Sequence, residues 1–223
     1  MAQLIRGLDA RRVADNLARV RAEIGDEIQV LAAVKYVAAE EMGVLAEAGV
    51  AVVGENRAQE LEVKALAHPE LTWDFIGHLQ SRKVKQVLPH VRWIHSVASD
   101  SALEQLGRHG GPQTQVLVEV NVARDESKSG VLPEDLDGFL ERCPVEVVGL
   151  MTMPPFTERS EHSRRWFAAL AELAGARGLR ELSMGTSQDY AVAAQEGATI
   201  VRLGTSLYTE VAGESAKRAN LPL

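Results

Sequence analysis

Eight short apolar segments, separated by stretches with helical spacing, constrain the fold of this chain more than any other feature. The segments are residues 28–35, 51–54, 73–77, 93–97, 115–121, 145–152, 181–184 and 199–203. Short apolar runs are typical of strands that are buried on both faces, as in parallel sheets. Strict alternation of such strands with helices favours a parallel sheet, and eight units in 223 residues predict an α/β fold, a closed (β/α)8 TIM barrel.

An additional helix is expected before the first strand. Apolar residues recur at helical spacing from Leu8 to Ile24, and this extra N-terminal helix would cover the gap between the last and first strands. The other expected helices are residues 38–48, 58–66, 81–88, 100–107, 133–142, 160–176 and 189–196, with Asp100 as an N-cap. The alternative, an open doubly wound sheet, would need a Gly-x-Gly-x-x-Gly turn after the first strand, and none occurs there. We expect residues 1–223 to form one barrel domain, with a loosely held polar tail from Val211 to Leu223.

Composition disfavours several classes of protein. The net charge is −7 and aromatic residues make up 4% of the chain, which argues against a nucleic-acid partner. Cys143 is the only cysteine, so no intrachain disulfide and no cysteine-based metal site can form. The N-terminus lacks the apolar core of a signal peptide, and no apolar run reaches transmembrane length. We therefore expect a cytoplasmic protein without a membrane partner, and a monomer because no long exposed apolar patch is evident.

Lys35 ends the first apolar segment. In parallel α/β folds this end of a strand faces the ligand crevice. Burial would lower the pKa of the lysine, and a neutral amine can attack a carbonyl to form a Schiff base. The alternative is a lysine whose ammonium reaches solvent and pairs with a carboxylate such as Glu55.

Two turns rich in glycine and hydroxyl groups follow the last two expected strands, at residues 185–188 and 204–206. Barrels often bind phosphate in the loops after these two strands, at a helix N-terminus. Glycine lets an oxygen approach the backbone, and the hydroxyls of Thr186, Ser187 and Thr205 can add donors. Each turn alone is also ordinary turn-and-cap chemistry, but the pair at both expected positions favours a phosphate site.

Arg202 lies one residue from the end of the eighth strand and is expected to point into the barrel or its mouth. A buried arginine needs an acceptor, which would be a carboxylate, a ligand nitrogen or a phosphate. Pyridoxal 5′-phosphate would use a lysine for its aldehyde, the turns for its phosphate and an arginine for its ring nitrogen. An arginine there would keep the ring nitrogen unprotonated and weaken carbanion chemistry.

The chain also resembles a known family, in order, from about Leu8 to Tyr208. The shared motifs are Lys35, Gly54-Glu55-Asn56, Phe75-Ile76-Gly77-His78-Leu79-Gln80, Lys83, His95-Ser96-Val97, Asn121, Ser127-Lys128-Ser129-Gly130, Gly149-Leu150-Met151-Thr152-Met153, Leu182-Ser183-Met184-Gly185 and Val201-Arg202-Leu203-Gly204-Thr205. Together they resemble the pyridoxal phosphate homeostasis proteins. The resemblance implies a barrel like the N-terminal domain of alanine racemase, the third fold type of pyridoxal-phosphate proteins.

The resemblance also implies roles for individual residues. Lys35 would hold the cofactor as a Schiff base, the turns around Ser187 and Gly204-Thr205 would hold its phosphate, and Arg202 would lie near the ring nitrogen. Asn56, Met184 and Thr186 are further candidate cofactor contacts, although Asn56 is alternatively a helix cap. The family is thought to bind and buffer the cofactor and has no firmly assigned reaction. Transient contacts with PLP-dependent enzymes are a further expectation.

The sequence departs from the family pattern at two places and leaves two other functions open. Val34 precedes the lysine and residues 36–38 follow it as Tyr-Val-Ala, while the turn after the seventh strand has Thr186 and Gln188 where methionine and aspartate are common.

A weak PLP-dependent racemase would need a second acid or base, for which Tyr36 and Tyr190 are candidates. A Schiff-base aldolase acting on a sugar phosphate is the other alternative. His78 and His95 alone are a weak metal signal, and we expect no metal site.

Overall fold

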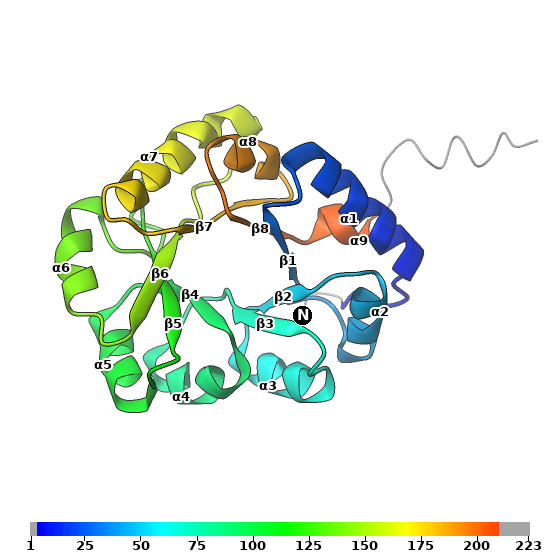
Figure 1. Ribbon diagram of the computed structural model, residues 1–223, viewed down its shortest axis with the longest axis horizontal. Coiled ribbons are helices and arrows are strands. Elements are labelled where there is room, and N and C mark those ends of the chain that lie inside the picture. The colour runs from blue at the N-terminus through cyan, green and yellow to red at the C-terminus, as the bar shows by residue number, and fades with distance from the viewer. Residues whose placement is uncertain (1–3, 210–223) are drawn as a thin grey trace, which may run out of the picture.

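The computed structural model describes residues 4–209, and within them eight parallel strands close into a barrel in sequence order (Figure 1). The strands are β1 (Gln29–Ala33), β2 (Val52–Glu55), β3 (Thr72–Phe75), β4 (Trp93–Val97), β5 (Gln115–Glu119), β6 (Glu146–Met151), β7 (Glu181–Thr186) and β8 (Ile200–Leu203). β1 pairs with β8 as well as with β2, so the sheet has no open edge. The prediction of a (β/α)8 barrel is therefore confirmed. The tail predicted from Val211 onward lies outside the described residues.

Helices surround the barrel (Figure 1). They are α1 (Ala10–Ile24), α2 (Met42–Glu47), α3 (Ala58–Ala67), α4 (Val84–Val87), α5 (Asp100–His109), α6 (Leu136–Glu141), α7 (Arg164–Gly175), α8 (Tyr190–Gln195) and α9 (Thr205–Tyr208). Five short 3-10 segments adjoin four of these helices, α2, α4, α6 and α7, at Ala39–Glu41, Ser81–Lys83, Leu88–His90, Pro133–Asp135 and Ser160–Ser163. None of the helices between residues 4 and 209 has the length and apolarity needed to span a bilayer.

The N-terminal helix closes the ring of helices as expected. α1 lies between α8 and α2 and contacts both, as well as α9 (Figure 1). Its N-cap is Asp9, whose side chain accepts a hydrogen bond from the Arg12 amide at 2.7 Å. At α5 the expected cap was wrong by one residue, because Ser99 rather than Asp100 accepts from the Ala102 amide. The short helix α9 was not predicted.

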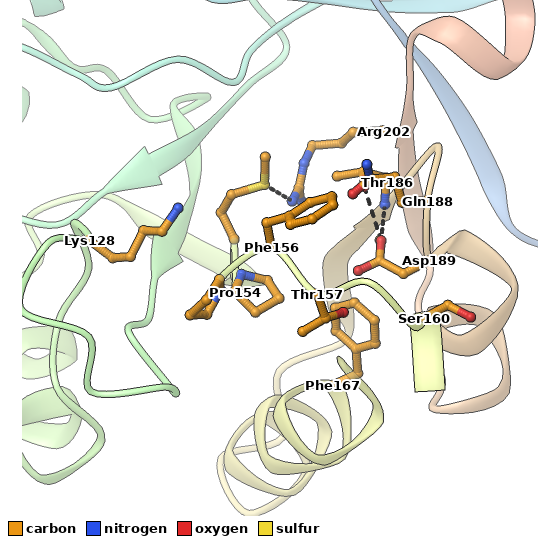
Figure 2. Close-up of a pocket in the computed structure, with 13 residues that line it drawn as sticks. Lys128, Pro154, Phe156, Thr157, Ser160, Phe167, Thr186, Gln188, Asp189 and Arg202 are labelled. Atoms are coloured by element: carbon orange, nitrogen blue, oxygen red, sulfur yellow. Dashed lines mark hydrogen bonds between the residues drawn. The ribbon is translucent and has the colours of Figure 1, made fainter. Parts of the chain in front are cut away.

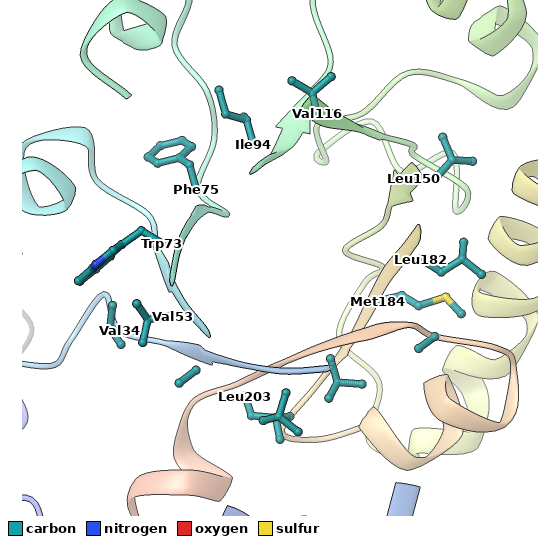
Figure 3. Packing of buried hydrophobic residues seen from close by; sticks show 14 of the residues in the cluster. Val34, Val53, Trp73, Phe75, Ile94, Val116, Leu150, Leu182, Met184 and Leu203 are labelled. Carbon is teal, nitrogen blue, oxygen red and sulfur yellow. The ribbon is translucent and has the colours of Figure 1, made fainter. Parts of the chain in front are cut away.

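Alternating side chains along each strand divide the interior into two layers. Val34, Val53, Trp73, Phe75 and Met184 belong to the layer between strands and helices, drawn in Figure 3. A smaller apolar cluster inside the barrel consists of Leu31, Val52 and Ile200, with Ile76 and Trp93 packed against it. Buried polar side chains, among them Asp74, His95 and Ser183, share the interior with this cluster.

Candidate functional site

A cavity of about 460 Å³ opens at the carboxyl ends of the strands. It is lined by Ala33, Lys35, Asn56, Ile76, Gly77, His78, Ser96, Glu119, Ser129, Met151, Met153, Thr186, Ser187, Gln188, Arg202, Gly204 and Thr205. Seven of the eight candidate cofactor residues are in this set. Lys35 and the two turns thus lie along one cavity.

Met184 is the candidate that does not line the cavity. Its neighbour Ser183 points into the barrel, so Met184 points outward, and its side chain is fully buried against the helices (Figure 3). The side chain of Met184 therefore cannot contact a ligand in the cavity in this arrangement.

Lys35 lies in a turn two residues past the end of β1. Leu31 and Ala33 face the inside of the barrel, and Lys35 continues this alternation. Of the two alternatives left open for Lys35, the structure shows the exposed one: the residue lies at the rim, with Nζ 4.7 Å from the centre of the Tyr36 ring. No ion pair of Lys35 is found among residues 4–209.

The carboxylate of Glu55 has a different partner from the one considered from sequence. It lies 2.7 Å from Nζ of Lys64, and both side chains are almost completely buried. Its second oxygen accepts from the backbone amides of Asn56 and Arg57 at 2.6 and 3.1 Å. Glu55 is therefore satisfied without Lys35, which leaves the amine of Lys35 available to a ligand.

The turn that carries Lys35 is anchored to neighbouring segments. The Tyr208 hydroxyl donates to the carbonyl oxygen of Ala33 at 3.2 Å, and the Ile5 amide donates to that of Tyr36 at 2.6 Å. Burial raises the pKa of the Tyr208 phenol far above its ordinary value, and the charge of Glu55 adds to the effect. Tyr208 thus remains a neutral donor, and it connects α9 to the lysine turn.

The two turns after β7 and β8 meet at the hydroxyl of Ser187. Its oxygen accepts from the backbone amides of Gly204 and Ser206 at 3.1 and 3.2 Å, and it lies 3.0 Å from the Ser206 hydroxyl. A methyl group built on Gly204 would meet no atom within 4 Å, so space is open beside this amide. Convergent N–H and O–H donors beside open space are the chemistry that holds an anion.

Arg202 is a buried cation with no carboxylate partner within 4 Å in the described part of the chain. Its guanidinium donates to the carbonyl and hydroxyl oxygens of Ser183, both at 2.6 Å, and to the Thr152 carbonyl at 2.8 Å. Burial lowers the pKa of Arg202 to about 10, although the charges of Glu119 and Asp189 act in the opposite direction. A hydrogen-bond acceptor that entered the cavity would meet the positive charge of Arg202, which is not paired with a carboxylate.

A chain of buried polar groups connects Arg202 to the far side of the barrel. Nδ1 of His95 lies 2.9 Å from the Ser183 hydroxyl, and Nε2 lies 3.2 Å from the Asp74 carboxylate. Asp74 also binds Arg92, at 2.6 Å. Because an ionised Asp74 accepts from Nε2–H, the Ser183 hydroxyl donates to Nδ1 and accepts from Arg202.

The pKa values of this network follow from its burial and its charges. Burial lowers the pKa of His95 below its ordinary 6.5 and outweighs the carboxylate of Asp74. For Asp74, burial acts to raise the pKa, but the hydrogen bonds and charges of His95 and Arg92 hold it below its ordinary value. His95 is therefore neutral and Asp74 ionised at neutral pH. Within residues 4–209, no group of three or more side chains is arranged to hold a metal ion together.

Asn56 presents an unsatisfied group at the cavity. Its Oδ1 atom is buried and has no hydrogen-bond partner among residues 4–209. The backbone of Asn56 is fixed by Gly77, where an added methyl group would lie 2.2 Å from the Asn56 carbonyl oxygen. An orphaned buried oxygen of this kind is costly unless a ligand or water supplies the missing bond.

A narrower crevice of about 160 Å³ adjoins the cavity and shares Arg202, Thr186, Gln188 and Met153 with it. Figure 2 shows Lys128 facing this crevice from one side, with Arg202, Phe156 and Asp189 on the other. Asp189 accepts from the amide and hydroxyl of Thr186, at 2.8 and 3.0 Å. Thr186 is thus engaged with its own turn, and its hydroxyl is not free for a ligand in this arrangement.

Glu119 lines the cavity but was not among the sequence candidates, whereas Ser129, which also lines it, was noted only as part of the motif at residues 127–130. The signal for Glu119 was present, because it is the one charged residue within the otherwise apolar run Val116–Val120. The two tyrosines considered as acids are elsewhere: neither lines the cavity, and Tyr190 donates to Glu23 at 2.5 Å. Burial, aided by Glu23, raises the pKa of Tyr190 to about 12.

Comparison with known proteins gives consistent matches. The family model of the alanine racemase N-terminal domain matches residues 8–211. The pyridoxal phosphate homeostasis protein of Aquifex aeolicus (strain VF5) is 40% identical over 197 residues, covering 82% of this chain and 86% of that protein. The protein of the same name from Escherichia coli (strain K12) is 30% identical over 225 residues, covering 88% and 95%.

Solved structures agree with these matches. PipY of Synechococcus elongatus PCC7942, without PLP, superposes with a TM-score of 0.80 at 34% identity, covering 88% of this chain and 100% of that chain. The same protein with PLP bound gives 0.78 at 32% identity, with the same coverage. A lysine/ornithine decarboxylase from Vibrio vulnificus gives 0.69 at 13% identity, over 90% of this chain and 62% of that chain, which indicates a shared fold alone.

Proposed function

The chain belongs to the pyridoxal phosphate homeostasis protein family, and on that premise we propose that it binds pyridoxal 5′-phosphate and takes part in the homeostasis of this cofactor. The relatives that carry this name match most of the chain, and PipY has been solved with PLP bound. The cofactor would be held as a Schiff base on Lys35. The protein would carry the cofactor without strong catalysis.

The observation that carries the proposal is that one cavity is lined by a free amine, an anion-holding pair of turns and a buried cation. These are Lys35, the turns at Ser187 and Gly204-Thr205, and Arg202. Their chemistry matches the aldehyde, the phosphate and the ring nitrogen of the cofactor. The orphaned Oδ1 of Asn56 adds a polar group that an occupied cavity would satisfy.

Each residue has a defined task in this proposal. Lys35 would supply the amine, and the start of its turn is anchored by the hydrogen bond from Tyr208 to the Ala33 carbonyl. The amides of Gly204 and Ser206, which Ser187 now satisfies, would turn to phosphate oxygens, with the hydroxyls of Ser187 and Thr205 as additional donors. Arg202 would donate to the ring nitrogen, while Ser183 and the Thr152 carbonyl hold its guanidinium in place. When bound, the cofactor supplies an aldehyde that reacts reversibly with amines.

The cellular setting is part of the proposal. We propose a cytoplasmic monomer that meets PLP-dependent enzymes transiently and has no nucleic-acid or membrane partner. The support is the net charge of −7, the single cysteine and the closed sheet. A racemase would need an acid or base on the face of the cofactor ring away from Lys35, and the two tyrosines considered for that role, Tyr36 and Tyr190, do not line the cavity.

The proposal is tested by cofactor uptake. Protein mixed with pyridoxal 5′-phosphate and then desalted should keep a visible absorption band, and Lys35→Ala should lose it. Lys85→Ala is the matched control, because Lys85 is an exposed lysine on α4 away from the cavity. Wild-type protein that leaves the column without cofactor would refute the proposal.

A further inference from the structure

Glu119 is a buried carboxylate that the proposed cofactor contacts do not use. It is the last residue of β5, it shares the inner face of the barrel with Leu117, and it is 6% exposed. Its side chain lines the cavity together with Lys35 and Arg202. A carboxylate with so little solvent is unfavourable unless it is paired or fully hydrogen-bonded.

Only one of the two carboxylate oxygens of Glu119 has a hydrogen-bond partner in the described chain. Oε1 accepts from the Ser129 hydroxyl at 2.7 Å, and Oε2 has no hydrogen-bond partner among residues 4–209. No cation of the described chain lies within 4 Å, so Arg202 and Lys35 face the same cavity without pairing with Glu119. One oxygen therefore faces the cavity as an unpaired, negatively charged acceptor.

Barrel topology places Glu119 opposite the lysine. β5 is four strands from β1 in either direction around the closed sheet, so Glu119 and Lys35 stand on opposite walls of the same mouth. Ser129, which holds Oε1, belongs to the loop that follows β5, and this loop is itself fixed by hydrogen bonds between Asn121 and Asp125. The carboxylate is thus held in place before any ligand arrives.

We propose that Glu119 forms a binding subsite for the ammonium group of a small primary amine or α-amino acid. An ammonium supplies both the positive charge and the N–H donors that Oε2 lacks. This inference deepens the proposed function, because primary amines are the molecules that compete with a lysine for an aldehyde. Within the described chain no second carboxylate lines the cavity, which argues against a metal ion as the occupant.

The test uses protein freed of cofactor and ethylammonium as the probe, with ethanol as an uncharged analogue of similar size. Ligand binding is followed by NMR titration of the protein. Wild-type protein should bind ethylammonium saturably and bind ethanol at least about tenfold more weakly, since tenfold corresponds to the loss of one charge-assisted contact. Glu119→Gln keeps the shape of the side chain but removes its charge, and it should weaken ethylammonium binding by about tenfold or more.

One variant serves as a matched control. Glu126→Gln removes an exposed charge from the same loop and should bind ethylammonium like wild type. Thermal unfolding of each variant verifies that it is folded before titration. Equal ethylammonium binding by wild type and Glu119→Gln, or equal binding of ethanol and ethylammonium, would overturn the subsite.

The outcome is independent of the test of cofactor uptake. Failure of the wild type to retain pyridoxal 5′-phosphate would refute the proposed function but leave the ammonium titration interpretable. A complementary measurement follows release of bound cofactor as L-alanine is added. L-alanine should accelerate cofactor release by a larger factor in wild type than in Glu119→Gln. An equal acceleration in the two proteins would count against the subsite.

Discussion

Lys64 donates a hydrogen bond from Nζ to the carbonyl oxygen of Val34, at 2.9 Å, directly before the turn that carries Lys35. The same ammonium is paired with Glu55, whose carboxylate holds the amide of Asn56. One buried ion pair therefore fixes the backbone at two positions of the cavity wall. Lys64 and Glu55 do not line the cavity themselves, so they act by positioning Lys35 and Asn56.

Substitution of this pair should separate stability from cofactor binding. Lys64→Met leaves Glu55 as an uncompensated buried charge, which is expected to lower the free energy of unfolding by about 3–5 kcal/mol. The double variant Glu55→Gln/Lys64→Met removes both charges and should recover most of that loss. Because it lacks the hydrogen bond to Val34, it should still bind pyridoxal 5′-phosphate more weakly than wild type. Urea denaturation and equilibrium dialysis measure the two quantities, and a double variant that binds normally would exclude a positioning role.

The Ser187 hydroxyl should contribute to phosphate recognition. Ser187→Ala removes the oxygen that the Gly204 and Ser206 amides now share and deletes one donor to an incoming anion. The affinity for pyridoxal 5′-phosphate should fall about tenfold, as for the loss of one hydrogen bond to a charged group. Pyridoxal, which lacks the phosphate, is the matched ligand and should bind wild type and variant alike. Equal losses for both ligands would place Ser187 away from the phosphate.

His95 should make stability depend on pH. Its pKa is lowered by burial, so below pH 6.5 the unfolded chain binds a proton that the native protein does not. The free energy of unfolding should therefore decrease as the pH falls below 6.5, by up to about 1.4 kcal/mol per pH unit. Asp74 acts at lower pH, where its depressed pKa adds a further loss below about 3.8. Urea denaturation between pH 7 and pH 5, in about half-unit steps, gives the slope.

The control for this pH dependence is His95→Asn. Asparagine cannot titrate, so this variant should have a smaller slope over the same pH range even though it is less stable at pH 7. Comparison of slopes rather than of absolute stabilities removes the cost of altered packing. Identical slopes in both proteins would mean that another group causes the dependence.

Much of the fold was predictable because the strands are buried on both faces. In β5 the expected residues 115–121 cover the strand Gln115–Glu119, since the buried run of residues 116–118 places apolar side chains both inside the barrel and toward the helices. Helix α9 was missed because four residues show no periodicity. The cap of α5 was misplaced because Ser99 and Asp100 are both good cap residues and sequence alone does not separate them.

The site was predicted in outline but not in its supporting contacts. Lys35, Arg202 and the two turns could be assigned to one site because each lies at or just after the carboxyl end of a strand, on the same face of the barrel. The burial of Lys35 was left open because an apolar run that ends in lysine fits both a buried and a solvent-exposed side chain, and the structure shows that it is exposed past the end of β1. The partner of Glu55 is Lys64, on the following helix, and sequence gives no basis for preferring it to Lys35. The roles of individual residues in cofactor binding stay predictions.

Borohydride trapping tests the central claim most directly. Wild-type protein loaded with pyridoxal 5′-phosphate is reduced, digested and mapped by mass spectrometry. The account predicts one reduced adduct, located on the peptide that contains Lys35 and absent from Lys35→Ala. An adduct on Lys64 or Lys128 instead, or retained cofactor without any covalent adduct, would contradict it.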